Sequence, residues 1–246
     1  MDKALFTLMT GANRSLQAQA VFANNLANIN TVGFRADLVN AGPIKEQPDD
    51  PKERVVEYTI ASKSDFTVGQ IEQTGGALDI AVATQGFIAV RAADKTEAYT
   101  RAGDLYVNGN GLLVTGRGDL VVGNGGPISI PPAEKMAIGL DGTISVQLLG
   151  QSAAALVQVD RIKLVNPDTD KLVKGGDGLF RNENGKKAQA DAEVQLRSGF
   201  IERSNVSAVG MLTKIISAAR QFEMQVKTMK TVQENAEASA QIMRMG

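Results

Sequence analysis

Two residue patterns in this chain could carry chemistry: glycine-rich loops and neighbouring carboxylates. Residues 116–118 (Gly-Arg-Gly) and 123–126 (Gly-Asn-Gly-Gly) have the glycine content of phosphate-binding loops, but neither precedes a helix pattern or a Lys-Ser/Thr pair. Residues 175–178 (Gly-Gly-Asp-Gly) have the composition of a calcium-binding glycine repeat, yet such sites need several copies and this one occurs once. All three segments are therefore predicted to be hairpin turns.

The carboxylates offer a second kind of chemistry. Asp104, Asp119 and Asp141 each lie beside a glycine, at turn positions where Asp is common because its side chain bonds to nearby backbone. Asp49 and Asp50 lie in a proline-flanked stretch typical of a solvated turn. No pattern brings two carboxylates to one cleft, so a glycosidase-like site is an open alternative without support from a motif.

The composition excludes several classes of site. The 246 residues include neither His nor Cys, which removes disulfides, thiolate nucleophiles and the common zinc sites. The net charge is −1 with Lys and Arg scattered along the chain, so no nucleic-acid partner is expected. No apolar run has the length of a bilayer span, and no membrane insertion is expected. We expect a protein without a cofactor or metal that is not an enzyme.

The N-terminal residues 3–28 are predicted to form an amphipathic helix. Its apolar stripe consists of Leu5, Met9, Ala12, Leu16, Ala23 and Leu26. Three asparagines are expected to cap and cross-bond the end of this helix: Asn24, Asn25 and Asn28. Gly33 is predicted to make a positive-φ turn, and Phe34 to anchor the chain beyond it. The stripe's polar interruptions argue against a cleaved signal peptide.

The C-terminal residues 207–243 are predicted to form a second helix of about 55 Å at 1.5 Å per residue. Ser204 or Asn205 is the expected N-cap. The apolar stripe consists of Met211, Ile215, Ala218, Phe222, Gln225, Met229, Ala236, Ala240 and Met243. We expect Leu5, Met9, Leu16 and Leu26 to pack with Met211, Ile215, Phe222 and Met229, within and between subunits. A simple intramolecular helical hairpin is the alternative, and the Ala-, Met- and Gln-rich stripes of unequal length favour packing among copies.

Between the helices the hydrophobic period changes to two, as in half-buried strands. Strands are predicted at 56–60, 78–82, 87–90, from Tyr99, and at 161–165 and 194–196, separated by glycine turns. The expected fold class is α+β: coiled-coil-like N- and C-terminal helices packed together, with a central all-β domain that is barrel-like or a sandwich. The expected segments are 1–35 (N-terminal helix), 36–75 (extended connector), 76–200 (central β domain) and 201–246 (long C-terminal helix).

Several motifs resemble those of the bacterial flagellar rod and hook proteins. They are 24–28 (Asn-Asn-Leu-Ala-Asn), 31–35 (Thr-Val-Gly-Phe-Arg), 74–81 (Thr-Gly-Gly-Ala-Leu-Asp-Ile-Ala), 85–87 (Gln-Gly-Phe), 99–103 (Tyr-Thr-Arg-Ala-Gly), 198–206 (Ser-Gly-Phe-Ile-Glu-Arg-Ser-Asn-Val) and 220–223 (Arg-Gln-Phe-Glu). They occur in order over nearly the whole chain. The short connector after Arg35 makes the chain most similar to the proximal-rod members, because distal rod and hook members carry extra residues there.

This resemblance implies a structural subunit of a helical tube, in which terminal helices form an inner layer around a central channel and β domains an outer layer. It implies other proximal and distal rod proteins as partners, together with the export apparatus and basal-body rings. The implied location is the basal body across the periplasm, reached by type III export without a cleaved leader. Two alternatives stay open: a distal-rod or hook-type axial protein, and a β-domain cell-wall glycan hydrolase or binding module on a helical oligomerisation stalk.

Overall fold

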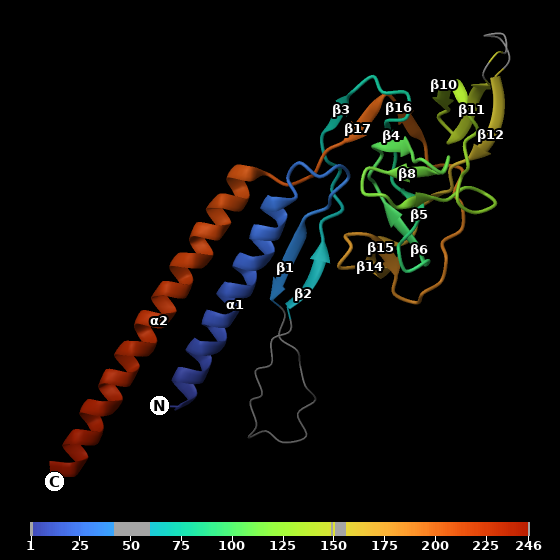
Figure 1. The fold of residues 1–246 in the computed structure, drawn as a ribbon. Helices are drawn as coiled ribbons and strands as arrows, with labels where there is room; N and C mark the ends of the chain where they lie inside the picture. Colours follow the sequence, from blue (N-terminus) through green and yellow to red (C-terminus); the bar gives the residue numbers. More distant parts are fainter. Residues whose placement is uncertain (1, 42–59, 149, 151–155, 246) are drawn as a thin grey trace. The chain divides into compact units, whose positions relative to one another are not determined.

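The computed structural model describes residues 2–41, 60–148, 150 and 156–245 (Figure 1). The chain divides into two compact units. Unit 1 comprises Met1–Ile29, Asp37–Asp65 and Val206–Gly246, and unit 2 comprises Asn30–Ala36 and Phe66–Asn205. Both ends of the chain therefore belong to the same unit, and the chain enters unit 2 twice.

Unit 1 is built on two long helices. Helix α1 spans Asp2–Ala27 and helix α2 spans Ala208–Met245, and they lie side by side and antiparallel (Figure 1). Both predicted helices are thereby confirmed. The predicted N-cap of α2 is wrong: the amide of Gly210 donates to Ser207 Oγ at 3.3 Å, which makes Ser207 the capping residue. Among the described residues, no helix has an apolar stretch that could cross a bilayer.

A β-hairpin completes unit 1. Strand β1 (Asp37–Ala41) pairs antiparallel with β2 (Ile60–Ser64), and β1 contacts α1. Both strands lie in the 36–75 segment expected as an extended connector, where a short strand such as Asp-Leu-Val-Asn-Ala has little period-two signal. The predicted strand at 56–60 lies outside the described residues except for Ile60, the first residue of β2.

Unit 2 consists of short antiparallel strands in four sheets. Its strands are β3 (Ile71–Gln73), β4 (Ile80–Val82), β5 (Phe87–Arg91), β6 (Glu97–Thr100), β7 (Leu105–Val107), β8 (Leu113–Thr115), β9 (Leu120–Val121), β10 (Ala133–Ile138), β11 (Thr143–Leu148), β12 (Leu156–Arg161), β13 (Leu164–Val165), β14 (Leu172–Lys174), β15 (Phe180–Asn182), β16 (Leu196–Ser198) and β17 (Phe200–Glu202). A 3₁₀ turn, η1 (Thr169–Lys171), precedes β14. The largest sheet has the order β14-β15-β6-β5-β9-β8-β7, with β13 also paired to β5.

Strand β5 explains why unit 2 has a two-sided core. Ile88 and Val90 belong to the main cluster of buried aliphatic side chains, whereas Phe87 and Ala89 belong to a second cluster on the opposite face. In that second cluster the rings of Phe66, Phe87 and Phe180 lie 5.2–6.0 Å apart. Because both faces are buried, β5 is a continuous apolar run and not an alternating one.

The α+β class with paired terminal helices and a β-rich centre is confirmed, and the sheets do not close into a barrel. The predicted strand at 161–165 is interrupted: β12 ends at Arg161, and β13 starts at Leu164. Ile162 makes only an isolated bridge to Gly123 between them, so the apolar run there covers two strands in different sheets.

Candidate functional site

Helix α1 carries two apolar faces rather than one. Ala12 and Ser15 are buried, and Leu8 and Phe22 are partly buried. The second face holds Phe6, Met9 and Leu16, which are 56%, 58% and 46% exposed. Of the sequence-predicted residues, Leu5 and Leu26 are thus partly covered, whereas Met9 and Leu16 lie open on the second face.

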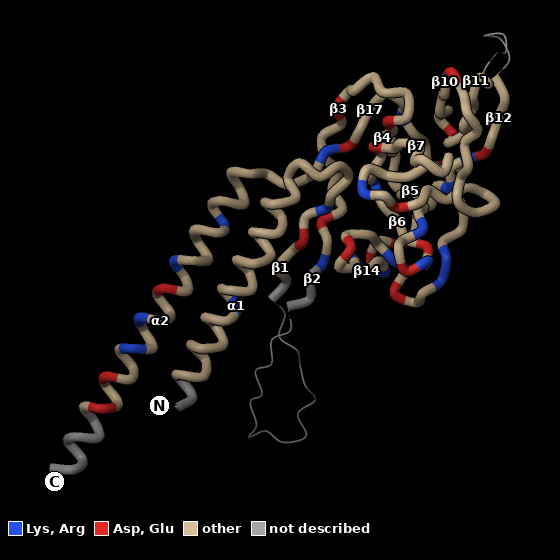
Figure 2. The backbone as a smooth tube through the Cα atoms, viewed as in Figure 1, with Lys and Arg blue, Asp and Glu red and all other residues tan. Residues whose placement is uncertain are grey.

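Helix α2 has the same two-faced character. Met211 is buried, and Ile215, Phe222 and Met229 are partly buried, so the predicted stripe is the better covered side of this helix. The exposed apolar side chains of α2 are Val209, Leu212, Ile216, Met224 and Val226. Charged residues are spread along α2 and are nearly absent from α1 (Figure 2). We call the two exposed sets, on α1 and α2, the open seams.

The contact between the helices is partly polar. Ser15 Oγ lies 3.4 Å from Gln225 Oε1, and a Cβ placed on Gly11 would lie 2.8 Å from Gln225 Nε2. Lys214 Nζ lies 5.7 Å from the centre of the Phe22 ring. The small residues Gly11 and Ser15 let the two helix backbones approach each other. A groove of about 460 Å³ lies between the helices beside them.

The three asparagines at the end of α1 differ in their side-chain contacts. Asn28 caps the helix, since its Nδ2 donates to Asn24 O at 3.0 Å, while the Asn24 side chain is exposed. Asn25 is fully buried and bonds to the β1 backbone in both directions. Its Nδ2 donates to Asp37 O and the Asp37 amide donates to its Oδ1, both at 2.8 Å. Asn25 therefore attaches the hairpin to the helix.

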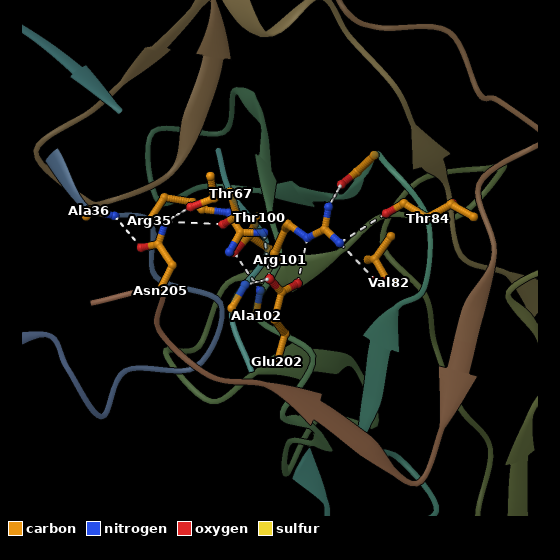
Figure 3. Close-up of polar contacts among 12 residues, drawn as sticks. Arg35, Ala36, Thr67, Val82, Thr84, Thr100, Arg101, Ala102, Glu202 and Asn205 are labelled. Carbon is orange, nitrogen blue, oxygen red and sulfur yellow. Dashed lines mark hydrogen bonds and ion pairs between the residues drawn. The ribbon is translucent and has the colours of Figure 1, made fainter. Parts of the chain in front are cut away.

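The most buried polar group of unit 2 is an ion triad formed by Arg35, Arg101 and Glu202 (Figure 3). Glu202 Oε1 lies 2.6 Å from Arg35 Nη2, and Glu202 Oε2 accepts from Arg101 Nε at 2.7 Å. The three side chains are 0%, 5% and 0% exposed for Arg35, Arg101 and Glu202. Glu202 Oε1 also accepts from the Gly69 amide at 2.8 Å.

Each charge of the triad has compensating contacts. Arg101 donates to the carbonyls of Gly86, Val82 and Thr84 at 2.9–3.1 Å. Burial lowers the pKa of Arg101, and the Glu202 carboxylate acts in the opposite direction. Arg35 is less well satisfied: its Nε and Nη1 have no hydrogen-bond partner among the described residues. Glu202 is the member on which the other two depend.

The residues before Arg35, Gly33 and Phe34, are also tightly packed within unit 2. Gly33 has a φ of +67°, as predicted, and a Cβ there would collide with the Arg101–Ala102 backbone. Its amide donates to Glu202 O at 2.7 Å. Phe34 is buried, and Lys174 Nζ lies 3.9 Å from the centre of its ring. The assembly role predicted for Phe34 stays a prediction.

Of the carboxylates considered for catalysis, Asp104, Asp119 and Asp141 contact different partners, and Asp49 and Asp50 lie outside the described residues. Asp104 forms an isolated bridge with Asp79, and burial raises the pKa of Asp104, with a smaller contribution from the Asp79 charge. Asp141 bonds to Thr143, and Asp119 lies near Thr115. Within the described ranges, no cluster of three or more acidic side chains could hold a metal ion.

Comparison with known protein families shows which family the chain belongs to. Residues 5–35 match the model described as flagella basal body rod protein, residues 81–146 the flagellar hook protein FlgE/F/G D1 domain, and residues 197–242 the flagellar basal body rod FlgEFG protein C-terminal model. The chain is 38% identical to the flagellar basal-body rod protein FlgF of Salmonella typhimurium over the full length of both. The chain belongs to the flagellar basal-body rod protein family.

Other relatives agree with this membership. The FlgF protein of Escherichia coli is 37% identical over the full length of both chains, and the FlgG protein of Agrobacterium fabrum is 30% identical over 95% of this chain and 97% of its own. The triad takes one residue from each matched segment of the rod family: Arg35, Arg101 and Glu202.

The motifs that resemble those of the rod and hook proteins contain all three triad residues, but sequence alone assigns them no joint role. Arg35, Arg101 and Glu202 each lie in a motif that is otherwise apolar or glycine-rich. This pattern was the signal for a buried ion cluster, because charged side chains are seldom buried without partners. Leu8 and Ser15 lie on the packed face of α1 but outside its predicted stripe, whereas Gln225, which contacts Ser15, belongs to the predicted stripe of α2. A stripe drawn one position away on α1 selected Met9 and Leu16 instead.

Proposed function

We propose that this protein is a structural subunit of the flagellar proximal rod, where it packs with other rod proteins into a helical tube that transmits torque and encloses the export channel. The FlgF relatives reach 38% identity, against 30% for the FlgG relatives, which favours the proximal-rod assignment over a distal-rod or hook-type one. In this proposal the partners are other rod proteins, the export apparatus and basal-body rings, and the subunit crosses the periplasm after type III export.

The observation that carries the proposal is the pair of open seams. Met9 and Leu16 on α1, and Leu212 and Ile216 on α2, are large apolar side chains that the protein's own fold leaves exposed. Each such side chain gains about 1.5–3 kcal/mol when it is fully buried. Helices that are apolar on two sides are suited to contact two neighbours, one within the chain and one in another subunit.

The same arrangement suits a shaft under torque. Contacts distributed along α1 and α2 share the load over many side chains, whereas exposed ion pairs contribute little individually. Because α2 has 38 residues and α1 has 26, the last turns of α2 extend beyond α1 (Figure 1). That extension is the part of α2 that most needs contacts from another subunit.

Leu16→Lys tests the proposal in cells that lack the parental gene copy. The residue is exposed, so the variant should fold, while a charge in the seam should lower incorporation into isolated basal bodies by about tenfold or more. Swimming in soft agar should be lost. Circular dichroism of the purified variant checks that the fold is intact.

Two matched variants make this result specific. Tyr106 on β7 of unit 2 is as exposed as Leu16, so Tyr106→Lys introduces the same charge at an equally exposed site that belongs to neither helix and should leave motility intact. Leu16→Met keeps an apolar side chain and should also swim. Normal incorporation of Leu16→Lys would contradict the proposal.

The rival function, a glycan hydrolase, can be tested on Asp104, whose carboxyl pKa is raised by burial and by the Asp79 charge. If the purified protein releases soluble fragments from peptidoglycan, and if Asp104→Asn abolishes that release, the hydrolase is favoured. Our proposal expects no release by either protein. In that case the Asp79 carboxylate serves only as the acceptor for the Thr74 hydroxyl, at 2.5 Å.

A further inference from the structure

A cationic cavity of about 420 Å³ lies within unit 2, and no residue of the ion triad lines it. Its charged lining consists of Arg91, Lys95, Glu97, Lys163 and Lys187, and the turn at residues 123–126 forms one wall. Arg91 and Glu97 come from β5 and β6, and the glycine-rich turn follows β9. The rod function gives this cavity no role.

Most of the positive charge in the cavity is unpaired. Lys163 Nζ is bonded to Glu97 Oε1 at 2.7 Å, and this pair is largely buried. In the part of the chain that the structure describes, no carboxylate pairs with Arg91, Lys95 or Lys187. Four cations, with Glu97 and the nearby Asp160, leave a net charge of +2 around the cavity.

Lys95 is held in an unfavourable backbone conformation. It has a φ of +66°, and it is the one non-glycine residue with a positive φ in the described ranges. It closes the β5–β6 turn, where its amide donates to Ala92 O at 2.9 Å. Glycine or asparagine is the usual residue for this conformation, because a side chain costs free energy there. Non-glycine residues held in such conformations cluster at functional sites.

The turn at 123–126 adds backbone donors to these side chains. Gly123 donates to Gly126 O at 2.7 Å, whereas the amides of Asn124 and Gly125 donate to no group in the described ranges. Open space surrounds Gly125, since a Cβ placed there would meet no atom within 4 Å. Successive free amides beside Lys and Arg side chains form the usual environment of a bound oxyanion.

We propose that this cavity binds a phosphate-class oxyanion, either free phosphate or a phosphoryl headgroup. A dianion with several acceptor oxygens matches both the net charge of +2 and the three unpaired cations better than a single carboxylate does. The cavity has no aromatic side chain among its lining residues that could stack on a base, so the phosphate group itself is the recognised part. This site does not depend on the proposed rod function.

Lys95→Gly tests the contribution of Lys95 to binding without destabilising the fold, because glycine removes the charge and relieves the backbone strain. Titration calorimetry of the full chain with inorganic phosphate, at constant ionic strength, should show saturable binding to the parent. Lys95→Gly should weaken the Kd at least about tenfold, while its Tm stays equal or rises. Arg91→Ala should weaken the Kd similarly.

Lys135→Ala is the matched control, since Lys135 is an exposed lysine on β10 outside the cavity lining. Its Kd should equal that of the parent, and an equal loss in this control would overturn the site as non-specific attraction. Binding of acetate as tight as that of phosphate would overturn the ligand class.

Vesicles distinguish the two sources of the phosphate group. Sedimentation with phosphatidylglycerol vesicles but not with phosphatidylcholine vesicles, lost in Lys95→Gly, would assign a phospholipid headgroup. Saturable binding of inorganic phosphate without sedimentation would assign the free ion. Failure of both probes would overturn the proposal, and neither result affects the motility test of the open seams.

Discussion

At the scale of single residues, Glu202 is the side chain on which unit 2 depends most. It pairs with two guanidinium groups and accepts the Gly69 amide, all without access to water. A buried ion pair adds little net stability compared with apolar residues, but removal of one partner leaves an uncompensated buried charge. The triad therefore makes the fold sensitive to the loss of any member, most of all the shared carboxylate.

Glu202→Gln should destabilise the protein by about 3–5 kcal/mol, because both buried guanidinium groups lose their counter-charge. Urea unfolding followed by circular dichroism measures this loss. Glu72→Gln is the control, since Glu72 pairs with Arg203 at 2.6 Å but both side chains are substantially exposed. The control should have nearly the parental midpoint, and equal midpoints for both variants would contradict this view of the triad.

Asp104 provides a pH-dependent prediction of defined sign. Burial, then the Asp79 charge, raises its pKa in the folded protein, although the Gly116 amide and Arg117 act against this. Its stabilising contribution is therefore present below the unfolded pKa of about 3.9 and is lost as the pH rises through the folded pKa. Asp104→Asn should raise Tm relative to the parent at pH 7, and this gain should shrink as the pH falls toward 4.

Asp141 should contribute to stability with the opposite pH dependence, and it serves as the control. Hydrogen bonds from Thr143 lower its pKa, so its contribution is present above the unfolded pKa and is lost as the pH falls through the folded one. Asp141→Asn should lower Tm at pH 7. Thermal scans between pH 3.5 and pH 7 that show the same slope for both variants would refute the assignment.

At the scale of elements, the helical period of the apolar residues predicts that α1 and α2 form. It does not predict which face of each helix turns toward the other. On α1 the faces through Met9 and Leu16, and through Ala12 and Ser15, are about 80° apart, and both are largely apolar or small. Local sequence cannot decide which face a partner covers. Within the chain the Ala12–Ser15 face is covered, whereas Met9 and Leu16 on the other face stay exposed.

Contacts between distant segments are the other part that sequence does not predict. The asparagine cluster indicated the end of α1, which is correct, but Asn25 acts by bonding to Asp37 in a strand that had no pattern of its own. Similarly, Arg35, Arg101 and Glu202 each lie in a recognisable motif, and only tertiary structure brings them together. The fold class followed from local periodicity, whereas the polar contacts between segments did not.

At the scale of the whole molecule, the chain enters unit 2 at residues 30–36 and again at 66–205. The short first entry supplies Gly33, Phe34 and Arg35, which contact Glu202 and Lys174 in the second. Unit 2 is therefore not contained in one continuous stretch of sequence. A boundary drawn at Arg35, as the helix pattern suggests, assigns these residues to the helical part of the chain.

Two truncated proteins that differ by seven residues test this division. The fragment 30–205 keeps Arg35 and should unfold cooperatively in urea. The fragment 37–205 lacks the Arg35–Glu202 ion pair, the Gly33 amide bond and the buried Phe34 ring, so it should be less stable by about 3–5 kcal/mol. Equal unfolding midpoints would mean that residues 30–36 belong energetically to the helices. A fragment 37–205 carrying Glu202→Leu and Arg101→Met should recover part of the loss, because apolar replacement removes the buried charges that the missing segment leaves uncompensated.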